Sequence, residues 1–242
     1  MEFRILGPLE VRDRGRVLSL GGGKQRCLLG VLLLHANEAV SSERLVDELW
    51  GAQPPARAAK LVQGNVSGLR KVLGAGRLAT QPPGYLVRLE WGELDLSEFE
   101  RLAADARAEQ DPARAADRWR AALSLWRGPA LADLRFEGFA SREAERLNEL
   151  RLAALLERIE ADLALGWHAQ LVGELEALVA EHPLQERLRG RLMLALYRSG
   201  RQAEALEVYR ATRSLLTEEL GLEPSQELQR VERLVLTQDP EL

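Results

Sequence analysis

The first part of the chain alternates between short apolar runs and turn residues. In residues 2–20, the runs are separated by Gly7-Pro8 and by Asp13 to Gly15. Apolar runs of this length between turn residues are typical of β-strands, so we expect a small antiparallel sheet. The apolar stretch from Lys24 to about Ala36 predicts a buried helix, in which Cys27 is expected to be a small core residue.

Two more helices and a hairpin are predicted before residue 90. In VSSERLVDELW, Ser41 suits an N-cap, and Glu43 lies in the first turn, where its charge favours the helix dipole. After Gly51, the proline pair 54–55 opens a helix that extends to about Leu73. The segments RLAT, QPPG and YLVRL then predict a β-hairpin.

The predicted helix 55–73 has one apolar face and one polar face. Its apolar positions are spaced by four, three and four residues, at Val62, Val66, Leu69 and Leu73. The opposite face presents Arg57, Lys60, Gly64, Ser67 and Lys71, with Leu61 and Gly68 on one edge and Gln63 and Arg70 on the other. No Asp or Glu occurs in residues 49–89, which include this helix and the hairpin. A surface that binds a polyanion requires such a charge pattern.

Charge divides the chain into a basic and an acidic part. Residues 1–90 contain 13 Lys and Arg against 8 Asp and Glu, or +5, whereas residues 91–242 contain 20 against 29, or −9. This asymmetry indicates two domains. In the basic part, the order helix, turn, basic helix, hairpin predicts a winged helix-turn-helix whose second helix would enter the major groove of DNA. The alternative is an ordinary solvated helix face that happens to be basic.

The glycine run LGGGKQR does not fit a nucleotide-binding loop. A P-loop requires the pattern G-x-x-x-x-G-K-[ST]. Counting back from Gly23-Lys24, Leu18 stands at the first glycine position, and Gln25 stands at the hydroxyl position. No G-x-G-x-x-G pattern begins at Gly21. We interpret the run as a turn from the sheet into the first helix.

Residues suited to catalysis or to metal binding are few. The single cysteine excludes an internal disulfide and suits a reducing cytoplasm, and His35, His168 and His182 are scattered without metal-ligand spacing. No paired carboxylates or nucleophile–base set stands out. The chain begins without the apolar region of a signal peptide, and no apolar run is long enough to span a membrane. We expect no enzyme activity, no cofactor and no metal.

From Asp95 onward, alanine, leucine and charged residues at helical spacing predict an all-α region with an internal repeat. LGWHAQLVGELEALV aligns with SGRQAEALEVYRATR at an offset of 34 residues, which places Gly166 on Gly200 and Leu175 on Tyr209. This offset is the tetratricopeptide period. DPARAADRWRAALSLW fits the same pattern, and a long helix from about Glu137 to Leu165 follows it. Such stacked helices most often bind protein partners, although a dimer contact or a spacer is the alternative.

The sequence blocks as a whole resemble a known family. They are FRILGPLEV, LGGGKQRCLLGVLLLHAN, VSSERLVDELWG, PPARAAKLVQGNVSGLRKVLG, PPGY, LWRGPALADL, RLAALLERIEADLALG and LMLALYRSGRQAEALEVYRATRSLLTEELGLEPS. This set is similar to the Streptomyces antibiotic regulatory proteins over nearly the whole chain. In that family of actinobacterial transcription factors, an OmpR-like winged helix precedes a bacterial transcriptional activation domain.

The resemblance implies a fold, a division of the chain and a set of partners. Residues 1–92 would form the winged-helix DNA-binding domain, and residues 93–242 the tetratricopeptide-like activation domain. The protein would be a cytoplasmic activator of secondary metabolism, such as antibiotic biosynthesis. Two protomers would bind side by side to direct repeats in double-stranded DNA upstream of promoters and contact RNA polymerase holoenzyme. Longer relatives carry an ATPase domain downstream, so the chain would be a small member or a piece of a long one.

The resemblance places the recognition helix at 55–73 and the wing at 77–89. We expect phosphate contacts from Arg57, Lys60, Arg70 and Lys71, and from Lys24 and Arg26 at the glycine turn. We expect base contacts from Leu61, Gln63, Asn65 and Ser67. The remaining expected DNA-binding positions are Gly64 and Gly68 in the helix and Thr80 and Gln81 in the wing.

Three positions depart from the family pattern. Relatives usually have a basic residue at position 68 and a β-branched residue at position 64, where this chain has Gly68 and Gly64. Each glycine costs the helix about 1 kcal/mol relative to alanine. The two glycines either allow close approach to the groove or alter base reading. Gln81 stands where an arginine is common, which weakens the expectation of a minor-groove contact.

A second class of function stays open at this point. The chain could be a helical-repeat adaptor whose winged helix binds protein instead of DNA. DNA affinity that depends steeply on salt distinguishes the two, because only a surface that neutralises phosphates releases counterions.

Overall fold

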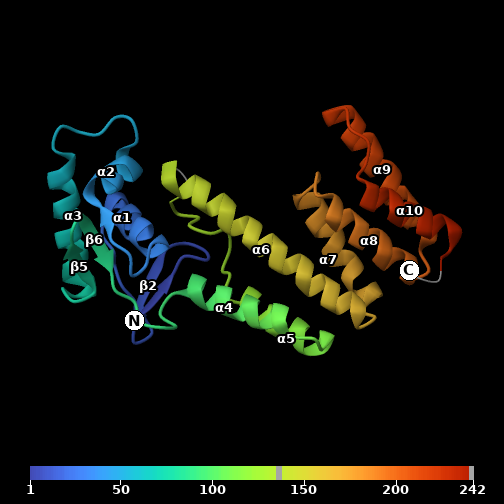
Figure 1. Ribbon diagram of the computed structural model, residues 1–242, viewed down its shortest axis with the longest axis horizontal. Coiled ribbons are helices and arrows are strands. Elements are labelled where there is room, and N and C mark those ends of the chain that lie inside the picture. The colour runs from blue at the N-terminus through green and yellow to red at the C-terminus, as the bar shows by residue number, and fades with distance from the viewer. Residues whose placement is uncertain (135–137, 240–242) are drawn as a thin grey trace. The chain divides into compact units, whose positions relative to one another are not determined.

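The computed structural model describes residues 1–134 and 138–239, and Figure 1 shows its helices and strands. The described strands lie within the first 87 residues, and the elements that follow are helices. Contacts divide the chain into two compact units, one made of residues 1–108 and 118–154 and the other of residues 109–117 and 155–242. The expected order, an α+β winged helix before an all-α region, is therefore correct.

The first three strands form the small antiparallel sheet that the alternating pattern predicted. They are β1 (Glu2–Arg4), β2 (Glu10–Asp13) and β3 (Arg16–Val17), in the order β1-β2-β3. Phe3 pairs with Val11 across β1 and β2, and both side chains are fully buried. They belong to the core because alternate residues of a strand point to the same face.

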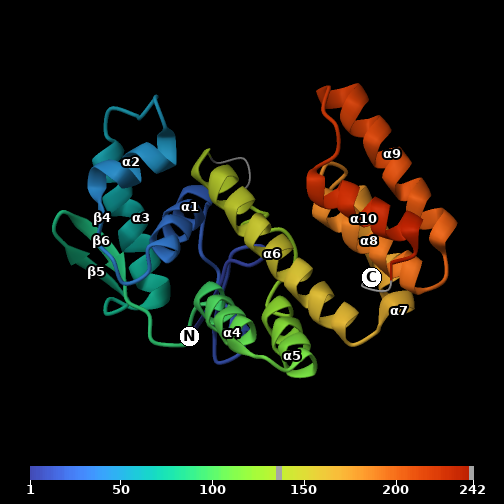
Figure 2. The same cartoon turned by 45° about the vertical axis from the view of Figure 1, so that its right-hand side comes forward.

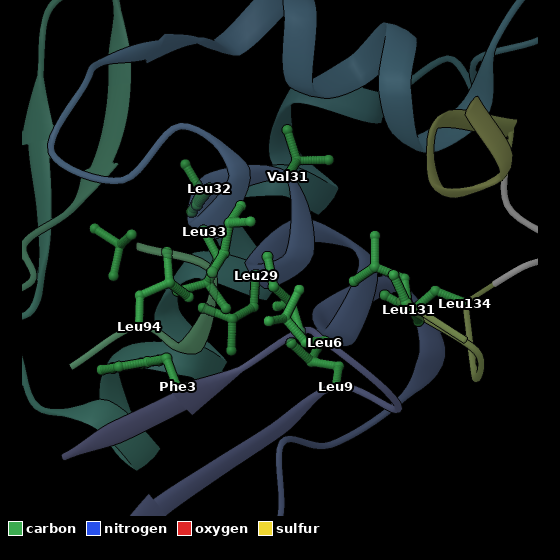
Figure 3. Close-up of a cluster of buried hydrophobic side chains, with 14 of the residues drawn as sticks. Phe3, Leu6, Leu9, Leu29, Val31, Leu32, Leu33, Leu94, Leu131 and Leu134 are labelled. Carbon is green, nitrogen blue, oxygen red and sulfur yellow. The ribbon is translucent and has the colours of Figure 1, made fainter. Parts of the chain in front are cut away.

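The first helix, α1 (Gly23–Leu34), passes through the middle of this unit. Its residues from Cys27 to Leu33 are all buried, so the expectation of a core role for Cys27 is correct. A helix that is apolar around its circumference must be covered on every side. Figure 3 shows Leu29, Leu32 and Leu33 of α1 pointing into one cluster with Phe3 and Leu6.

Helices α2 (Ser42–Trp50) and α3 (Ala58–Leu73) follow. The hydroxyl of Ser41 accepts a hydrogen bond from the Arg44 N–H at 3.1 Å, which confirms the predicted N-cap. The basic helix begins at Ala58, three residues later than Pro55, because residues before it form a turn closed by the Ala58 N–H on the Pro55 carbonyl at 2.9 Å.

The predicted hairpin is formed by β5 (Leu78–Gln81) and β6 (Gly84–Val87), next to α3 in both Figure 1 and Figure 2. Pro82 and Pro83, joined by a cis peptide bond, form the turn. A strand that the sequence pattern did not indicate, β4 (Val40–Ser41), pairs with β6 and completes a sheet of order β4-β6-β5. Gly84 permits this pairing, because a Cβ at that position would overlap the Val40 carbonyl oxygen.

The next helices are α4 (Asp95–Ala108), α5 (Pro112–Leu123) and α6 (Gly138–Ala164). The predicted long helix from about Glu137 is α6, and Glu137 itself lies outside the described residues. The segment before α6 packs against the residues that follow β1: the Arg127 N–H donates to the Leu6 carbonyl at 2.8 Å, and the Leu131 N–H donates to the Ile5 carbonyl at 3.1 Å. Figure 3 shows Leu131 of this segment in the same cluster of buried side chains as Leu6.

The second unit contains α7 (His168–Glu181), α8 (Glu186–Arg198), α9 (Gln202–Leu220) and α10 (Gln226–Thr237). Helix α8 packs against α7, α9 and α10. The repeated glycines, Gly166 and Gly200, have φ angles of +82° and +79° and precede α7 and α9, so the repeat marks equivalent left-handed turns. The aligned residues Leu175 and Tyr209 are both buried.

The part of the chain that the structure describes contains neither a candidate membrane-spanning helix nor a candidate metal site. None of its helices combines the length and the hydropathy that a membrane span requires. No group of three or more His, Cys, Asp or Glu side chains there is arranged to hold a metal ion.

Candidate nucleic-acid interface

Helix α3 has the two faces that its residue spacing predicted. Its buried residues are Ala58, Val62, Val66, Leu69 and Leu73. Its exposed residues are Ala59, Lys60, Leu61, Gln63, Gly64, Ser67 and Lys71, while Asn65, Gly68 and Arg70 are partly exposed. The side chain of Leu61 is 46% exposed although it is large and apolar. Its place on the edge of the exposed face is therefore confirmed, and it contributes little to the core.

Three cations at this surface have no partner among the described residues. Arg57 is exposed at the N-cap of α3, and Lys60 and Lys71 are exposed one turn and four turns further along the helix. None of their three side chains forms a hydrogen bond or an ion pair with the residues that the structure describes. Because no acidic residue occurs in residues 49–89, no carboxylate of α3 or of the hairpin neutralises these charges. They are available to an anionic partner.

Arg70 has a structural role that the sequence did not indicate. Its Nε donates to the Leu78 carbonyl at 2.8 Å, and its Nη2 donates to the Thr80 hydroxyl at 2.7 Å. Its guanidinium also lies 6.0 Å from the centre of the Tyr85 ring. Two residues expected at the interface, Arg70 and Thr80, thus join α3 to the hairpin. The expected phosphate contact of Arg70 stays a prediction.

Lys24 and Arg26, on the first turn of α1, also have partners within the first unit. The Lys24 ammonium donates to the Leu49 carbonyl at 2.6 Å, at the end of α2. Arg26 forms an ion pair with Asp133, and its Nη2 donates to the Leu9 carbonyl at 2.6 Å. Asp133 is 107 residues away along the chain, so no local pattern could reveal it. Contacts of these two cations with phosphate stay predictions.

The two glycines of α3 lie in different surroundings. A Cβ at Gly64 would meet no heavy atom within 4 Å, so this position is open to an approaching molecule. A Cβ at Gly68 would overlap the side-chain amide of Gln25, which comes from α1. Sequence reasoning treated the two glycines alike and did not include Gln25 among the candidate residues.

The wing presents two exposed residues at its tip. Thr80 and Gln81 are exposed at the end of β5, and the side chain of Gln81 forms no hydrogen bond with the described residues. Arg77, at the base of the hairpin, is not available in the same way, because both of its terminal nitrogens donate to Glu93.

Comparisons with known protein families match two separate parts of the chain. Residues 14–86 match the family described as transcriptional regulatory protein, C terminal, and residues 94–236 match the bacterial transcriptional activator domain. Both families are of transcription regulators and not of enzymes.

Relatives are similar over the whole chain. Regulatory protein AfsR of Streptomyces coelicolor is 46% identical, with 100% of this chain aligned to 25% of AfsR, so the chain spans about a quarter of that protein. Regulatory protein DnrI of Streptomyces peucetius is 40% identical, with 99% of this chain aligned to 93% of DnrI. A structure of Mycobacterium tuberculosis EmbR in complex with a low-affinity phosphopeptide is 36% identical, with a TM-score of 0.93 over 99% of this chain and 65% of that chain. The chain therefore belongs to the Streptomyces antibiotic regulatory protein family, in which an OmpR-like winged helix precedes a bacterial transcriptional activator domain.

Proposed function

We propose that this chain activates transcription by binding DNA through α3 and the wing. The observation that carries the proposal is the exposed, acid-free face of α3, with Arg57, Lys60 and Lys71 unpaired among the described residues. An α-helix fits the major groove, and cations without internal partners bind phosphates without first breaking an ion pair. The absence of Asp and Glu from residues 49–89 argues against an ordinary solvated helix face that happens to be basic.

The residues of this surface divide into two roles. Arg57, Lys60 and Lys71 neutralise phosphates and set the position of the helix on the duplex. Leu61, Gln63, Asn65 and Ser67 face base edges, with the apolar Leu61 suited to a thymine methyl group. Arg70 holds the wing against α3 through Thr80, and Gln81 lies at the wing tip. The functional boundary in this proposal lies near residue 92, with activation assigned to residues 93–242.

The relatives supply the finer parts of the proposal. DnrI is named a regulatory protein, and RedD of Streptomyces coelicolor, 40% identical, is named a transcriptional regulator. By this likeness we assign the chain to the control of a secondary-metabolite gene cluster in the cytoplasm. Two protomers bind direct repeats side by side, and residues 93–242 contact RNA polymerase holoenzyme.

The decisive experiment measures the DNA affinity of the full chain at several salt concentrations. Wild-type protein should bind the intergenic DNA next to its own gene, with an affinity that falls steeply as salt rises. Lys60→Ala and Lys71→Ala should each reduce the slope by about one unit. Arg210→Ala, at an exposed position of α9, serves as the matched loss of one positive charge and should leave the slope unchanged. Equal slopes for all four proteins would refute DNA binding by α3 and favour the adaptor.

A further inference from the structure

The side chain of Gln25 lies between two glycines that are far apart in the sequence. It leaves the first turn of α1 and is partly exposed. A Cβ at Gly21 would overlap its Oε1, and a Cβ at Gly68 would overlap its Nε2. Gly21, with φ of +79°, belongs to the turn before α1, whereas Gly68 belongs to α3. The glycines thus leave room for one amide and restrict its rotamer.

Most of the hydrogen-bonding capacity of this amide is unused. Among the described residues, its one hydrogen bond is from Nε2 to the Asn65 carbonyl, at 3.5 Å. A glutamine amide can donate two hydrogen bonds and accept two. A bond at 3.5 Å is also at the limit of useful length. The amide therefore keeps donor and acceptor capacity for a further partner.

The position of the amide relates it to the exposed face of α3. It lies over Gly68 and next to Asn65, which are both partly exposed, and Ser67 beside them is exposed. Position 68 has no side chain of its own, so the Gln25 amide occupies the volume that such a side chain would fill. Glutamine amides pair with adenine edges and also donate to phosphate oxygens.

We propose that Gln25 is a DNA-contacting residue that acts in place of the side chain missing at position 68. The inference rests on the proposed DNA binding by α3 and extends the interface to α1. Because the two glycines already restrict the amide, little conformational entropy is lost when it binds. Gly68 then contributes to the recognition surface indirectly, because the absence of a Cβ leaves room for the Gln25 amide.

The test compares two substitutions of Gln25 in the full chain. Gln25→Ala should weaken binding about fivefold, as expected for one lost hydrogen bond. Gln25→Glu has nearly the same shape but adds a negative charge, so close to phosphates it should weaken binding more and reduce the salt slope by about one unit. Gln170→Glu, exposed on α7, is the matched control for an added charge and should bind like wild type.

Gly68→Ala supplies an independent arm, because its Cβ displaces the amide without altering Gln25. It should weaken binding as Gln25→Ala does, and the double variant should lose no more than either single variant. DNA probes with one changed base pair or one uncharged phosphate identify the group that Gln25 contacts. On the probe that lacks this group, wild-type protein and Gln25→Ala should bind with equal affinity. Thermal unfolding of each variant shows whether it is folded. If Gln25→Glu does not fold, Gln25→Ala still tests the inference, because it adds no charge.

The outcomes separate this inference from the proposed function. If the wild-type chain shows no salt-dependent DNA binding, the proposed function fails. If wild-type protein binds but Gln25→Ala binds equally well, and Gln25→Glu behaves like Gln170→Glu, the amide only packs between the glycines and the inference is overturned. Equal losses on every probe would overturn it as well, because they indicate a general displacement of α3.

Discussion

Arg77 and Glu93 form a bidentate ion pair, with Nη1–Oε2 and Nη2–Oε1 distances of 2.6 and 2.7 Å. The pair joins the base of the wing to the segment before α4. The same carboxylate accepts hydrogen bonds from the Glu90 N–H at 2.8 Å and from the Met1 amino group at 3.1 Å, while the Glu93 carbonyl accepts from Phe3 at 2.6 Å. Glu93 therefore connects the hairpin, the first sheet and the segment that leads to α4.

This arrangement predicts a pH dependence of stability. Burial raises the pKa of Glu93, but hydrogen bonds from the Glu90 N–H, the Met1 amino group and Arg77 outweigh it, and the pKa lies below its ordinary value. A lowered pKa means that the ionised carboxylate stabilises the fold above the unfolded-state pKa, and that this contribution disappears as the pH falls through the folded-state pKa. Glu93→Gln should therefore lower the melting temperature at pH 7, and its effect should become smaller as the pH falls below the ordinary pKa of a glutamate. Glu90→Gln, whose side chain has no described partner, should change little over the same pH range.

Asn37 should be essential for the connection between α1 and α2. It has φ of +67°, and its side-chain amide both donates to the Leu89 carbonyl at 3.1 Å and accepts from the Leu89 N–H at 2.9 Å. Asn37→Ala removes both bonds and strains the left-handed backbone, so it should destabilise the protein by about 2–4 kcal/mol. Asn37→Gly keeps the backbone relaxed and should cost about 1 kcal/mol less. Denaturant unfolding of both variants checks this, and equal losses would show that the backbone contributes nothing.

We expect Gly64 to lower the stability of α3 and, in return, to let the helix backbone approach DNA closely. Because no atom lies within 4 Å of a Cβ placed there, Gly64→Ala should stabilise α3 by about 1 kcal/mol. If the backbone approaches DNA at this position, the added methyl group should weaken DNA binding at the same time. Calorimetry and a binding titration on one sample give both quantities. A variant that is more stable and binds DNA at least as tightly would place Gly64 away from the groove.

Leu61 should affect sequence discrimination more than overall affinity. Its side chain is 46% exposed, so Leu61→Ala should change the free energy of unfolding by less than about 1 kcal/mol. Competition binding with single-position operator variants should show a loss of about 1 kcal/mol of discrimination at one base pair, with the salt slope unchanged. Equal loss of specific and non-specific affinity would indicate that Leu61 does not read a base.

The tandem arrangement on direct repeats has a geometric consequence. Protomers side by side require their half-sites on one face of the duplex, about one helical turn apart. Inserting half a turn between the repeats should therefore abolish cooperative binding while each half-site keeps its own affinity. Cooperativity that persists on the altered spacing would argue against contact between neighbouring protomers.

Features that depend on neighbours along the chain could be predicted from the amino-acid sequence. The spacing of Val62, Val66 and Leu69 predicted the buried face of α3, because residues three and four apart lie on one side of a helix. Ser41 predicted the start of α2, and the glycines at the 34-residue offset marked two left-handed turns before helices. These are local preferences of backbone and side chain, so they can be read without knowledge of the fold.

Which polar side chains near the interface have partners inside the protein depends on the folded structure. Arg26 pairs with Asp133, Arg70 donates to Thr80, and the amide of Gln25 lies over Gly68. In the sequence, Arg26 and Arg70 are cations like Lys60 and Lys71, whose side chains have no partner among the described residues, and Gln25 was not a candidate. The difference arises because folding brings distant segments into contact, and a side chain's available hydrogen bonds depend on which segment lies beside it.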